Sequence, residues 1–340
     1  MKGTMLYGAH DVRFEERPDP QIIEPTDAII KLSAACVCGS DLWPYRGIDK
    51  VKEPVAMGHE YCGIVEEVGS EVKHIKPGQF VVGSFFASDN TCEICKSGYQ
   101  SSCIDRVGMG GIGTQAEYAR IPLADGTLVA TPELPPADLI PGLLSTSDVL
   151  GTGWFGALAA DVAPGKTVAV VGDGAVGLLG ILSSQADGCG ADHCHEPQPR
   201  PSKLALEFGA TDIVTERGDE GVARIKDLTN GLGAHSVIEA VGTQESMMQS
   251  IRATRVGGHV GFVGVLHGVE IEGWEYFFSH VHLHGGPAPV RNYLPHLIDL
   301  VLNGKINPGK VFDLTLPLSQ VAEGYKAMDE RRAIKALLMP

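Results

Sequence analysis

The segment "TVAVVGDGAVGLLGIL" constrains the fold of this 340-residue chain more than any other stretch. An apolar run, Thr167 to Val171, enters the glycine pattern Gly172-x-Gly174-x-x-Gly177, and an apolar helical segment follows. In such a unit the first glycine permits a tight turn, the second lets the backbone approach a pyrophosphate, and the third lets helix and strand pack closely. The N–H groups at the start of the helix attract the phosphates. The segment therefore predicts a dinucleotide site, and a glycine-rich turn without a ligand is the alternative.

The pattern of apolar runs predicts two domains of different class. Residues 1–150 contain short apolar runs between Gly/Pro turns, which is typical of an all-β domain. After that, the runs "GATDIVTE", "AHSVIEAVG", "GGHVGFVGVL" and "VHLHGG" alternate with helix-like stretches up to residue 288, which predicts a doubly wound parallel sheet. Residues 289–340 contain two helical patterns and a final strand. We therefore expect an α/β chain, and its length exceeds that of most single cores.

Composition excludes several classes of function. A formal net charge of −15 argues against nucleic-acid binding, which needs a basic surface. The chain has no apolar run of about 18 residues that would span a membrane, and its first residues lack the apolar core of a signal peptide. We therefore expect a cytoplasmic protein without nucleic-acid or membrane partners. In that compartment the eight cysteines are expected to be metal ligands or free thiols rather than disulfides.

The cysteines and histidines of the first domain indicate a metal site. Cys38 lies in "AACVCGSDLWPYRG" and His59 in "GHEYCGIVEEVG", on separate loops, and their donor atoms suit zinc. Asp148, in "LLSTSDVLGTGWFGA", is the candidate third ligand. Taken singly, these residues could be a buried thiol, a core histidine and a helix N-cap, but their occurrence together ahead of a nucleotide domain favours a metal. Cys36 and Cys62 have no partner in this pattern and are interpreted as packing residues.

These motifs together resemble the zinc-dependent medium-chain alcohol dehydrogenase family nearly from end to end. The resemblance rests on "CGSD", on the pattern GHExxGxxxxxG from Gly58 to Gly69, on the cysteine lobe "DNTCEICKSGYQSSC" and on the nucleotide turn. It implies a GroES-like, mostly-β catalytic domain over 1–150, a Rossmann domain over 151–288 and a return to the catalytic domain over 289–340. It also implies that Cys38, His59 and Asp148 hold a catalytic zinc, which Glu60 approaches when water or substrate exchanges.

The cysteine lobe resembles the structural zinc site of the same family. Cys92, Cys95 and Cys103 match three of the four expected ligand positions, and Asp89 stands at the fourth. A carboxylate oxygen can bind zinc, so a closed site is expected, although it should bind less tightly than four thiolates. The alternative is a lobe that has lost its metal.

The resemblance implies hydride transfer between NAD(P) and a carbinol carbon, with zinc as the Lewis acid. Ser40 would accept the hydroxyl proton, or it is only a turn hydroxyl. Trp43 stands where many relatives carry a proton-relaying histidine, and because an indole cannot relay protons, we expect it to wall the substrate pocket. The residues expected to bind the cofactor are Gly172, Asp173, Gly174, Ala175, Val176, Gly177, Thr152, Val241, Val263 and Gly264.

The expected function is that of an alcohol dehydrogenase or carbonyl reductase, acting on an alcohol, aldehyde or ketone. The alternatives are a polyol, sugar or amino-alcohol dehydrogenase of the same family, and a non-catalytic regulator that senses NAD(P). We also expect a homodimer or homotetramer. His280, His282 and His284 alternate on one strand and could form a third metal site, but the simpler interpretation is a sheet strand that ends near the nicotinamide.

One segment contradicts the expected fold. The second strand of the nucleotide sheet should follow the first helix, but "SSQADGCGADHCHEPQPRPSK" has no apolar run. Codons for Gln185 to Ser202 can be chosen so that the +1 frame reads "KQMGAERIIAMSRNPARR", which contains a buried-strand pattern. We infer a compensating pair of frameshifts, and a divergent loop is the alternative. The Ser-Arg of the +1 frame would favour NADP, whereas Glu196 of the given frame would favour NAD through its 2′-hydroxyl.

Peptide mass spectrometry tests the frameshift hypothesis. If the +1 frame is the true one, the intact mass differs from that of the given sequence and peptides from this region contain "IIAMSR". NADP should then bind more tightly than NAD, because an arginine donates charge-assisted hydrogen bonds to the 2′-phosphate. Recovery of a peptide containing Asp192 and His193 from stable, active enzyme would contradict the hypothesis.

Overall fold

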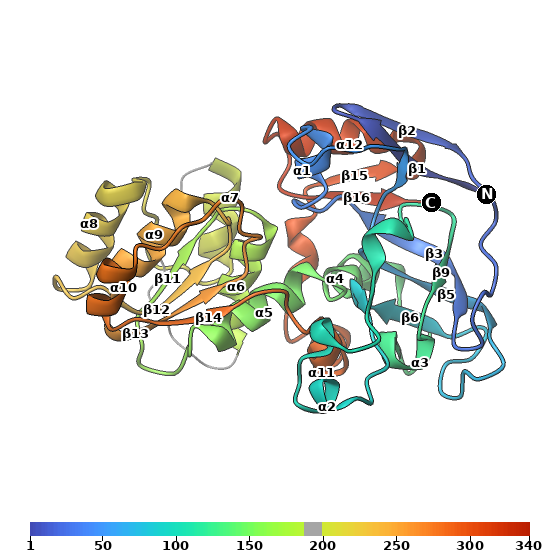
Figure 1. Ribbon diagram of the computed structural model, residues 1–340, viewed down its shortest axis with the longest axis horizontal. Helices are drawn as coiled ribbons and strands as arrows, with labels where there is room; N and C mark the ends of the chain where they lie inside the picture. Colours follow the sequence, from blue (N-terminus) through green and yellow to red (C-terminus); the bar gives the residue numbers. More distant parts are fainter. Residues whose placement is uncertain (187–198) are drawn as a thin grey trace. The chain divides into compact units, whose positions relative to one another are not determined.

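The computed structural model describes residues 1–186 and 199–340, which form two compact units (Figure 1). The first unit comprises Met1–Asp148 and Pro289–Pro340, and the second comprises Val149–Ala288. The strands are β1 (Lys2–Gly8), β2 (Asp11–Glu16), β3 (Ala28–Cys36), β4 (Val55–Ala56), β5 (Tyr61–Val68), β6 (Phe80–Gly83), β7 (Phe86–Ala87), β8 (Val107–Gly108), β9 (Tyr118–Ile121), β10 (Leu128–Ala130), β11 (Val168–Val171), β12 (Ala234–Glu239), β13 (Thr254–Phe262), β14 (His282–Gly285), β15 (Leu314–Pro317) and β16 (Ala336–Met339).

The α-helices within residues 1–148 are short, whereas those of the second unit and of residues 289–340 are longer. The α-helices are α1 (Leu42–Tyr45), α2 (Glu93–Lys96), α3 (Ala124–Thr127), α4 (Ile140–Ser145), α5 (Val149–Ala159), α6 (Ala175–Ala186), α7 (Pro199–Glu207), α8 (Gly218–Leu228), α9 (Gln244–Ala253), α10 (Gly273–Ser279), α11 (Val290–Leu302) and α12 (Val321–Asp329). Short 3₁₀ turns lie at Gln100–Ser102, Met109–Gly111, Ala137–Leu139, Pro308–Val311 and Leu318–Gln320. In the described residues, no helix combines the length and apolar character that crossing a membrane requires.

The first unit is built around β3, whose side chains are buried along most of its length. The main sheet has the order β10-β6-β5-β3-β16-β15, and β9 also pairs with β3. β3 runs antiparallel to both neighbours, with Ala35 opposite Tyr61 of β5 and Cys36 opposite Leu337 of β16. The carboxyl end of β3 therefore lies beside the first residues of β5 and β16.

The second unit is a doubly wound parallel sheet with the order β11-β12-β13-β14 in the described residues. Val237 of β12 belongs to the core that α8 and α9 cover. The next residue, Ile238, faces α5, since a Cβ placed on Gly156 would lie 3.0 Å from its Cγ2. Successive residues of β12 thus enter different layers, as a parallel sheet covered on both faces requires. The GroES-like and Rossmann fold class is confirmed.

Two expectations about local structure are corrected. The run "GATDIVTE" is not a strand: only Ala210 and Val214 of its residues are buried, and Thr211 and Thr215 donate hydrogen bonds to the carboxylates of Asp212 and Glu216. Such local bonds compete with a strand ladder. His280 precedes β14 and ends α10 in a left-handed conformation, with φ of 52°. The predicted second strand of the nucleotide sheet falls largely on residues 187–198, including Glu196, which lie outside the described residues.

Candidate active site

Four side chains of the first unit form a buried cluster of metal-binding donors. Cys38 follows β3, His59 and Glu60 precede β5, and Asp148 follows α4. One ligand atom from each lies within 4.8 Å of the others. Asp148 Oδ2 is 3.2 Å from His59 Nε2 and 3.8 Å from Cys38 Sγ. The structure therefore brings together the four residues that the sequence predicts for a catalytic metal.

The spacing of these donors fits a tetrahedral zinc. With usual zinc–ligand bond lengths, a tetrahedron separates nitrogen from oxygen by about 3.4 Å and sulfur from oxygen by about 3.6 Å. In the structure, the nitrogen–oxygen separation between His59 and Asp148 is 3.2 Å and the sulfur–oxygen separation between Cys38 and Asp148 is 3.8 Å, both close to these values. A thiol, an imidazole and a carboxylate are also the donors that zinc takes in enzymes. The site therefore fits the metal in both geometry and chemistry.

Asp41, which was not predicted from the sequence as a site residue, orients two of the four candidate ligands. Its Oδ1 lies 3.5 Å from His59 Nδ1, which leaves Nε2 of that ring available for a metal. Its Oδ2 accepts hydrogen bonds from the backbone N–H of Cys38 at 3.0 Å and from Gln115 Nε2 at 3.2 Å. Its place in the motif "CGSD" was the signal that could have identified it.

Glu60 is paired with a buried lysine that was not predicted from the sequence either. Lys335 Nζ lies 2.7 Å from Glu60 Oε1 and donates to the backbone oxygen of Val37 at 3.1 Å. The two side chains are 1% and 0% exposed. Glu60 Oε2 has no hydrogen-bond partner in the described parts of the chain. One oxygen of this carboxylate is therefore held by a cation, and the other remains available beside Cys38, His59 and Asp148.

Burial and the neighbouring charges act in opposite directions on the pKa of Glu60 and on that of Lys335. Burial raises the pKa of Glu60, and the ammonium group of Lys335 opposes that change. Burial alone would lower the pKa of Lys335, but the nearby Cys36 and Glu60 outweigh it and hold that pKa well above its usual range. The ammonium group thus remains charged inside the protein. Lys335 lies 275 residues after Glu60, so no local spacing linked the two, and its charge within the apolar run "AIKALLM" was the only signal.

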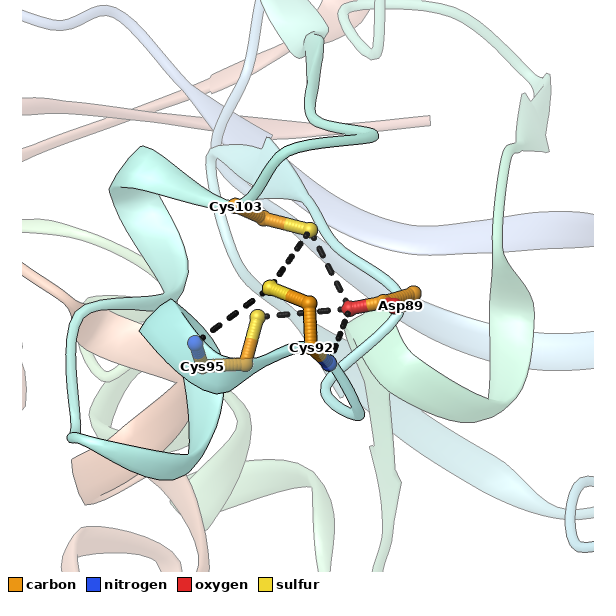
Figure 2. Close-up of side chains that lie close together, drawn as sticks. All are labelled: Asp89, Cys92, Cys95 and Cys103. Atoms are coloured by element: carbon orange, nitrogen blue, oxygen red, sulfur yellow. Dashed lines mark hydrogen bonds between the residues drawn. The ribbon is translucent and has the colours of Figure 1, made fainter.

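A second cluster lies in the cysteine lobe (Figure 2), where three thiols and one carboxylate lie close together. Asp89 Oδ1 lies 3.1 Å from Cys103 Sγ and 3.3 Å from Cys95 Sγ, and Cys92 Sγ lies 4.0 Å from Cys103 Sγ. A tetrahedral zinc places two sulfurs about 3.8 Å apart and a sulfur and an oxygen about 3.6 Å apart. The four side chains therefore fit one zinc ion.

Hydrogen bonds favour ionisation of two of these candidate ligands. Burial opposes ionisation of Asp89, but hydrogen bonds from Thr91 and Cys103 outweigh it and hold the pKa of this carboxyl well below its usual range. Backbone N–H groups of Ile104 and Cys95 lower the pKa of the Cys92 thiol. Deprotonated oxygen and sulfur are the forms that bind zinc.

The nucleotide turn has the geometry that its sequence predicts. It joins β11 to α6, and Gly172 has φ of 126°, which favours glycine. A Cβ on Gly177 would lie 2.1 Å from the backbone oxygen of Gly172, whereas a Cβ on Gly174 would meet nothing within 4 Å. The first and third glycines are thus required by the fold. The second leaves open space in front of the helix, where a phosphate group is expected.

The other predicted site residues occupy varied surroundings. Ser40 lies just before α1 and Trp43 lies within it, and both side chains are half-buried. Cys36 is buried in β3 and Cys62 is buried in β5. Asp173, Ala175 and Val176 lie in the nucleotide turn and the first turn of α6, Thr152 is buried in α5, Val241 follows β12, and Val263 and Gly264 follow β13.

The three histidines near β14 do not come together. His282 stacks on His259 with ring centroids 4.3 Å apart, whereas His284 meets Phe155 edge-on at 5.7 Å. Two groups of described residues could hold a metal ion, and neither contains these histidines. The simpler interpretation, a sheet strand, therefore holds for His282 and His284.

Comparison with known proteins matches both units. The model "Alcohol dehydrogenase GroES-like domain" matches residues 24–133, and "Zinc-binding dehydrogenase" matches residues 175–301. Zinc-type alcohol dehydrogenase B of Aspergillus flavus is 33% identical over 99% of this chain and 81% of its own length. NADP-dependent isopropanol dehydrogenase of Entamoeba histolytica is 28% identical over 92% of this chain and 87% of its own length.

Solved structures agree with these sequence relatives. Alcohol dehydrogenase TADH from Thermus sp. ATN1 has a TM-score of 0.90 and 30% identity, covering 100% of this chain and 99% of that protein. A zinc-binding dehydrogenase of Sinorhizobium meliloti 1021, bound to NADP, has a TM-score of 0.83 and 26% identity, covering 100% and 99%. The relatives named here are dehydrogenases, so the comparisons do not favour a non-catalytic regulator.

Replacing Lys335 should destabilise the first unit. Lys335→Met leaves the Glu60 carboxylate buried without its cation, which typically lowers the free energy of unfolding by about 3–5 kcal/mol. Urea unfolding of the zinc-loaded protein measures the change. Glu60→Gln combined with Lys335→Met should recover most of the loss, because no buried charge is then left alone. A single-variant loss below about 1 kcal/mol would contradict a buried pair of this kind.

Proposed function

Because this chain belongs to the zinc-dependent medium-chain alcohol dehydrogenase family and is an NAD(P)-dependent oxidoreductase acting on CH–OH groups, we propose that Cys38, His59 and Asp148 hold its catalytic zinc. One observation carries the proposal: a sulfur and a nitrogen lie 3.8 Å and 3.2 Å from one oxygen of Asp148. Glu60, with an unpaired oxygen beside them, is the proposed fourth protein group. It would be able to approach a zinc held there when water or substrate exchanges.

The chain's own residues prepare this chemistry. Bound zinc supplies a Lewis acid that favours the alkoxide in alcohol oxidation and polarises the carbonyl in reduction. Asp41 holds His59 in the orientation that presents Nε2. Ser40, half-buried and two residues after Cys38, accepts the proton that leaves the substrate hydroxyl. Trp43 has no titratable group to pass that proton on, so it serves as a wall of the substrate pocket.

The substrate class follows from the site and the relatives. A site that would hold a Lewis-acidic zinc beside the hydroxyl group of Ser40 suits a small alcohol and the matching aldehyde or ketone. The isopropanol dehydrogenase relative supports this class. The experiment that tests it is turnover of a panel of primary and secondary alcohols with each cofactor. Absence of zinc-dependent turnover across the panel would contradict the proposal.

The second unit is proposed to bind the cofactor at the turn between β11 and α6. Residues 172–177 present the helix N-terminus to the pyrophosphate. Thr152, Val241, Val263 and Gly264 are proposed to contact the rest of the cofactor. The NADP-bound relative from Sinorhizobium meliloti supports NADP, in line with the +1 frame of the segment outside the described residues. Comparing the dissociation constants of NADP and NAD tests this preference.

The aromatic side chains of α10 support the proposed homodimer or homotetramer. Trp274, Phe277 and Phe278 are 72%, 73% and 56% exposed, and β14 lies at an end of the sheet in the described order. Exposed apolar patches on soluble proteins often mark interfaces. Replacing Trp274 and Phe277 with Ser should lower the mass measured by light scattering if this patch joins subunits.

Removing Cys38 should abolish turnover but leave cofactor binding intact. The thiolate is a zinc ligand, whereas the nucleotide turn belongs to the other compact unit. Cys38→Ala should lose one zinc per chain and at least about 10³-fold in kcat, while the dissociation constant for NAD(P)H changes little. Cys62→Ala is the control, because that thiol is buried but lies outside the donor cluster. Full activity of Cys38→Ala would contradict the assignment.

The lobe should hold a second zinc through Asp89, Cys92, Cys95 and Cys103. Elemental analysis should then approach two zincs per chain, and Cys103→Ala should remove one of them. Because a closed site has no position for substrate, this variant should lose thermal stability while kcat changes less than about threefold. The outcome that contradicts the proposal is a stoichiometry near one that falls to zero in Cys38→Ala.

A further inference from the structure

Glu239 is a buried acid at the carboxyl end of β12, just before the turn that contains Val241 and Gly242. It is the last residue of β12, and its side chain is 0% exposed. Its Oε1 accepts hydrogen bonds from the backbone N–H groups of Val241 at 2.9 Å and Gly242 at 2.8 Å, and from Ser246 Oγ at 2.7 Å. A single carboxylate oxygen therefore organises the turn that follows the strand.

Two of these three donors are successive backbone N–H groups. Such groups point to the same side of a turn and form a cradle for one acceptor. Here the cradle is filled from inside the protein by Glu239, so the conformation of Val241 and Gly242 is fixed by a side-chain contact. This turn lies at the carboxyl end of a parallel strand, which is where doubly wound sheets bind their ligands. Val241 is 37% exposed there.

Glu239 also contacts the next turn along the sheet. Its backbone oxygen accepts hydrogen bonds from Val263 at 2.8 Å and Gly264 at 3.2 Å, the residues that follow β13. A Cβ on Gly264 would lie 2.7 Å from Glu239 Oε2 and 2.3 Å from the backbone nitrogen of Gly242. The turns after β12 and β13 are thus packed against each other around this acid, at a distance that only glycine permits.

The glycine turn after β11 joins the same group. A Cβ on Gly172 would lie 3.0 Å from Val241 Cγ2 and 3.2 Å from the backbone oxygen of Ala240. Displacement of the turn after β12 would therefore also disturb the phosphate-binding turn. The ends of three consecutive strands therefore pack around the turn whose N–H groups donate hydrogen bonds to Glu239.

The second oxygen of Glu239 indicates that this arrangement is not optimised for stability alone. Oε2 is buried and has no hydrogen-bond partner among the residues that the structure describes. An unsatisfied buried acceptor is costly for a folded protein. Residues that carry such a cost are commonly found where function requires a fixed geometry.

We propose that Glu239 is a positioning residue of the cofactor site. It holds the turns after β12 and β13 so that their backbone groups face bound NAD(P), and it acts through Val241, Gly242 and Gly264. The inference rests on the proposed cofactor site, and it adds a residue that the glycine pattern does not contain.

Removal of the side chain tests the proposal. Glu239→Ala deprives Val241 and Gly242 of their common acceptor, so the dissociation constant for NAD(P)H, measured from cofactor fluorescence, should rise by about tenfold or more. KM for the cofactor should rise with it, while kcat at saturating cofactor and the zinc content change little. Glu239→Gln keeps one acceptor oxygen, and its dissociation constant should stay within about threefold of the wild type.

Ser246→Ala is the matched control for a purely structural effect. It removes a donor to the same oxygen and breaks the capping box that Ser246 forms with Thr243 at the start of α9, but it leaves both turn N–H bonds in place. It should therefore lose thermal stability and keep its affinity for NAD(P)H within about twofold. Hydrogen exchange of the peptide that contains Val241 and Gly242 should be faster in Glu239→Ala than in Ser246→Ala.

The outcomes separate this inference from the proposed function. A dissociation constant for Glu239→Ala within about twofold of the wild type, or an equal loss in Ser246→Ala, would overturn the positioning role. A wild-type protein that binds neither NAD nor NADP would overturn the proposed cofactor site instead. If Glu239→Ala does not accumulate as folded protein, Glu239→Asp, one methylene too short to reach the turn, carries the same expectation and the same overturning result.

Discussion

The antiparallel pairing of β3 with β5 and with β16 is the constraint on which the candidate catalytic centre depends. The register places Cys36 beside Leu337 and Ala35 beside Tyr61. Cys38, Glu60 and Lys335 all stand just beyond these paired residues. Because side chains alternate along a strand, a shift of one residue would turn such a set to the opposite face. The proposed ligands Cys38 and Glu60, together with Lys335, are thus positioned by ladder hydrogen bonds between segments that are distant in the sequence.

The two units use buried carboxylates in a similar way. Glu60 in the first unit and Glu239 in the second are both fully buried, and each has one oxygen held by strong donors. In each, the other oxygen has no partner in the described residues. Both acids adjoin a strand end where a loop carries proposed functional groups. The donors differ, however: an ammonium group balances charge at Glu60, whereas backbone N–H groups fix a turn at Glu239.

Local motifs made the fold class and the donor clusters predictable from the sequence. Residues that meet only through long-range strand pairing could not be predicted. Cys38, His59 and Asp89 stand in short patterns whose spacing carries their meaning, and the glycine turn was identified in the same way. Lys335 could not be placed, because its partner lies 275 residues away and the strand register that joins them has no local signature. The prediction of a strand around Val214 was wrong. The segment has the apolar residues of a strand pattern, but Thr211 and Thr215 form hydrogen bonds with the carboxylates of the residues that follow them.

The order of the chain gives the Glu60–Lys335 pair a consequence for biosynthesis. A ribosome adds about 5–20 residues per second, so the 275 residues between the two partners take roughly 15–55 s to appear. During that interval Cys38, His59 and Glu60 are already present, while the strand that delivers the balancing ammonium group does not yet exist. The nascent first unit therefore cannot bury Glu60 with its cation until translation has passed through the whole nucleotide-binding unit. Completion of the proposed catalytic centre is in this way delayed until the nucleotide-binding unit has been made.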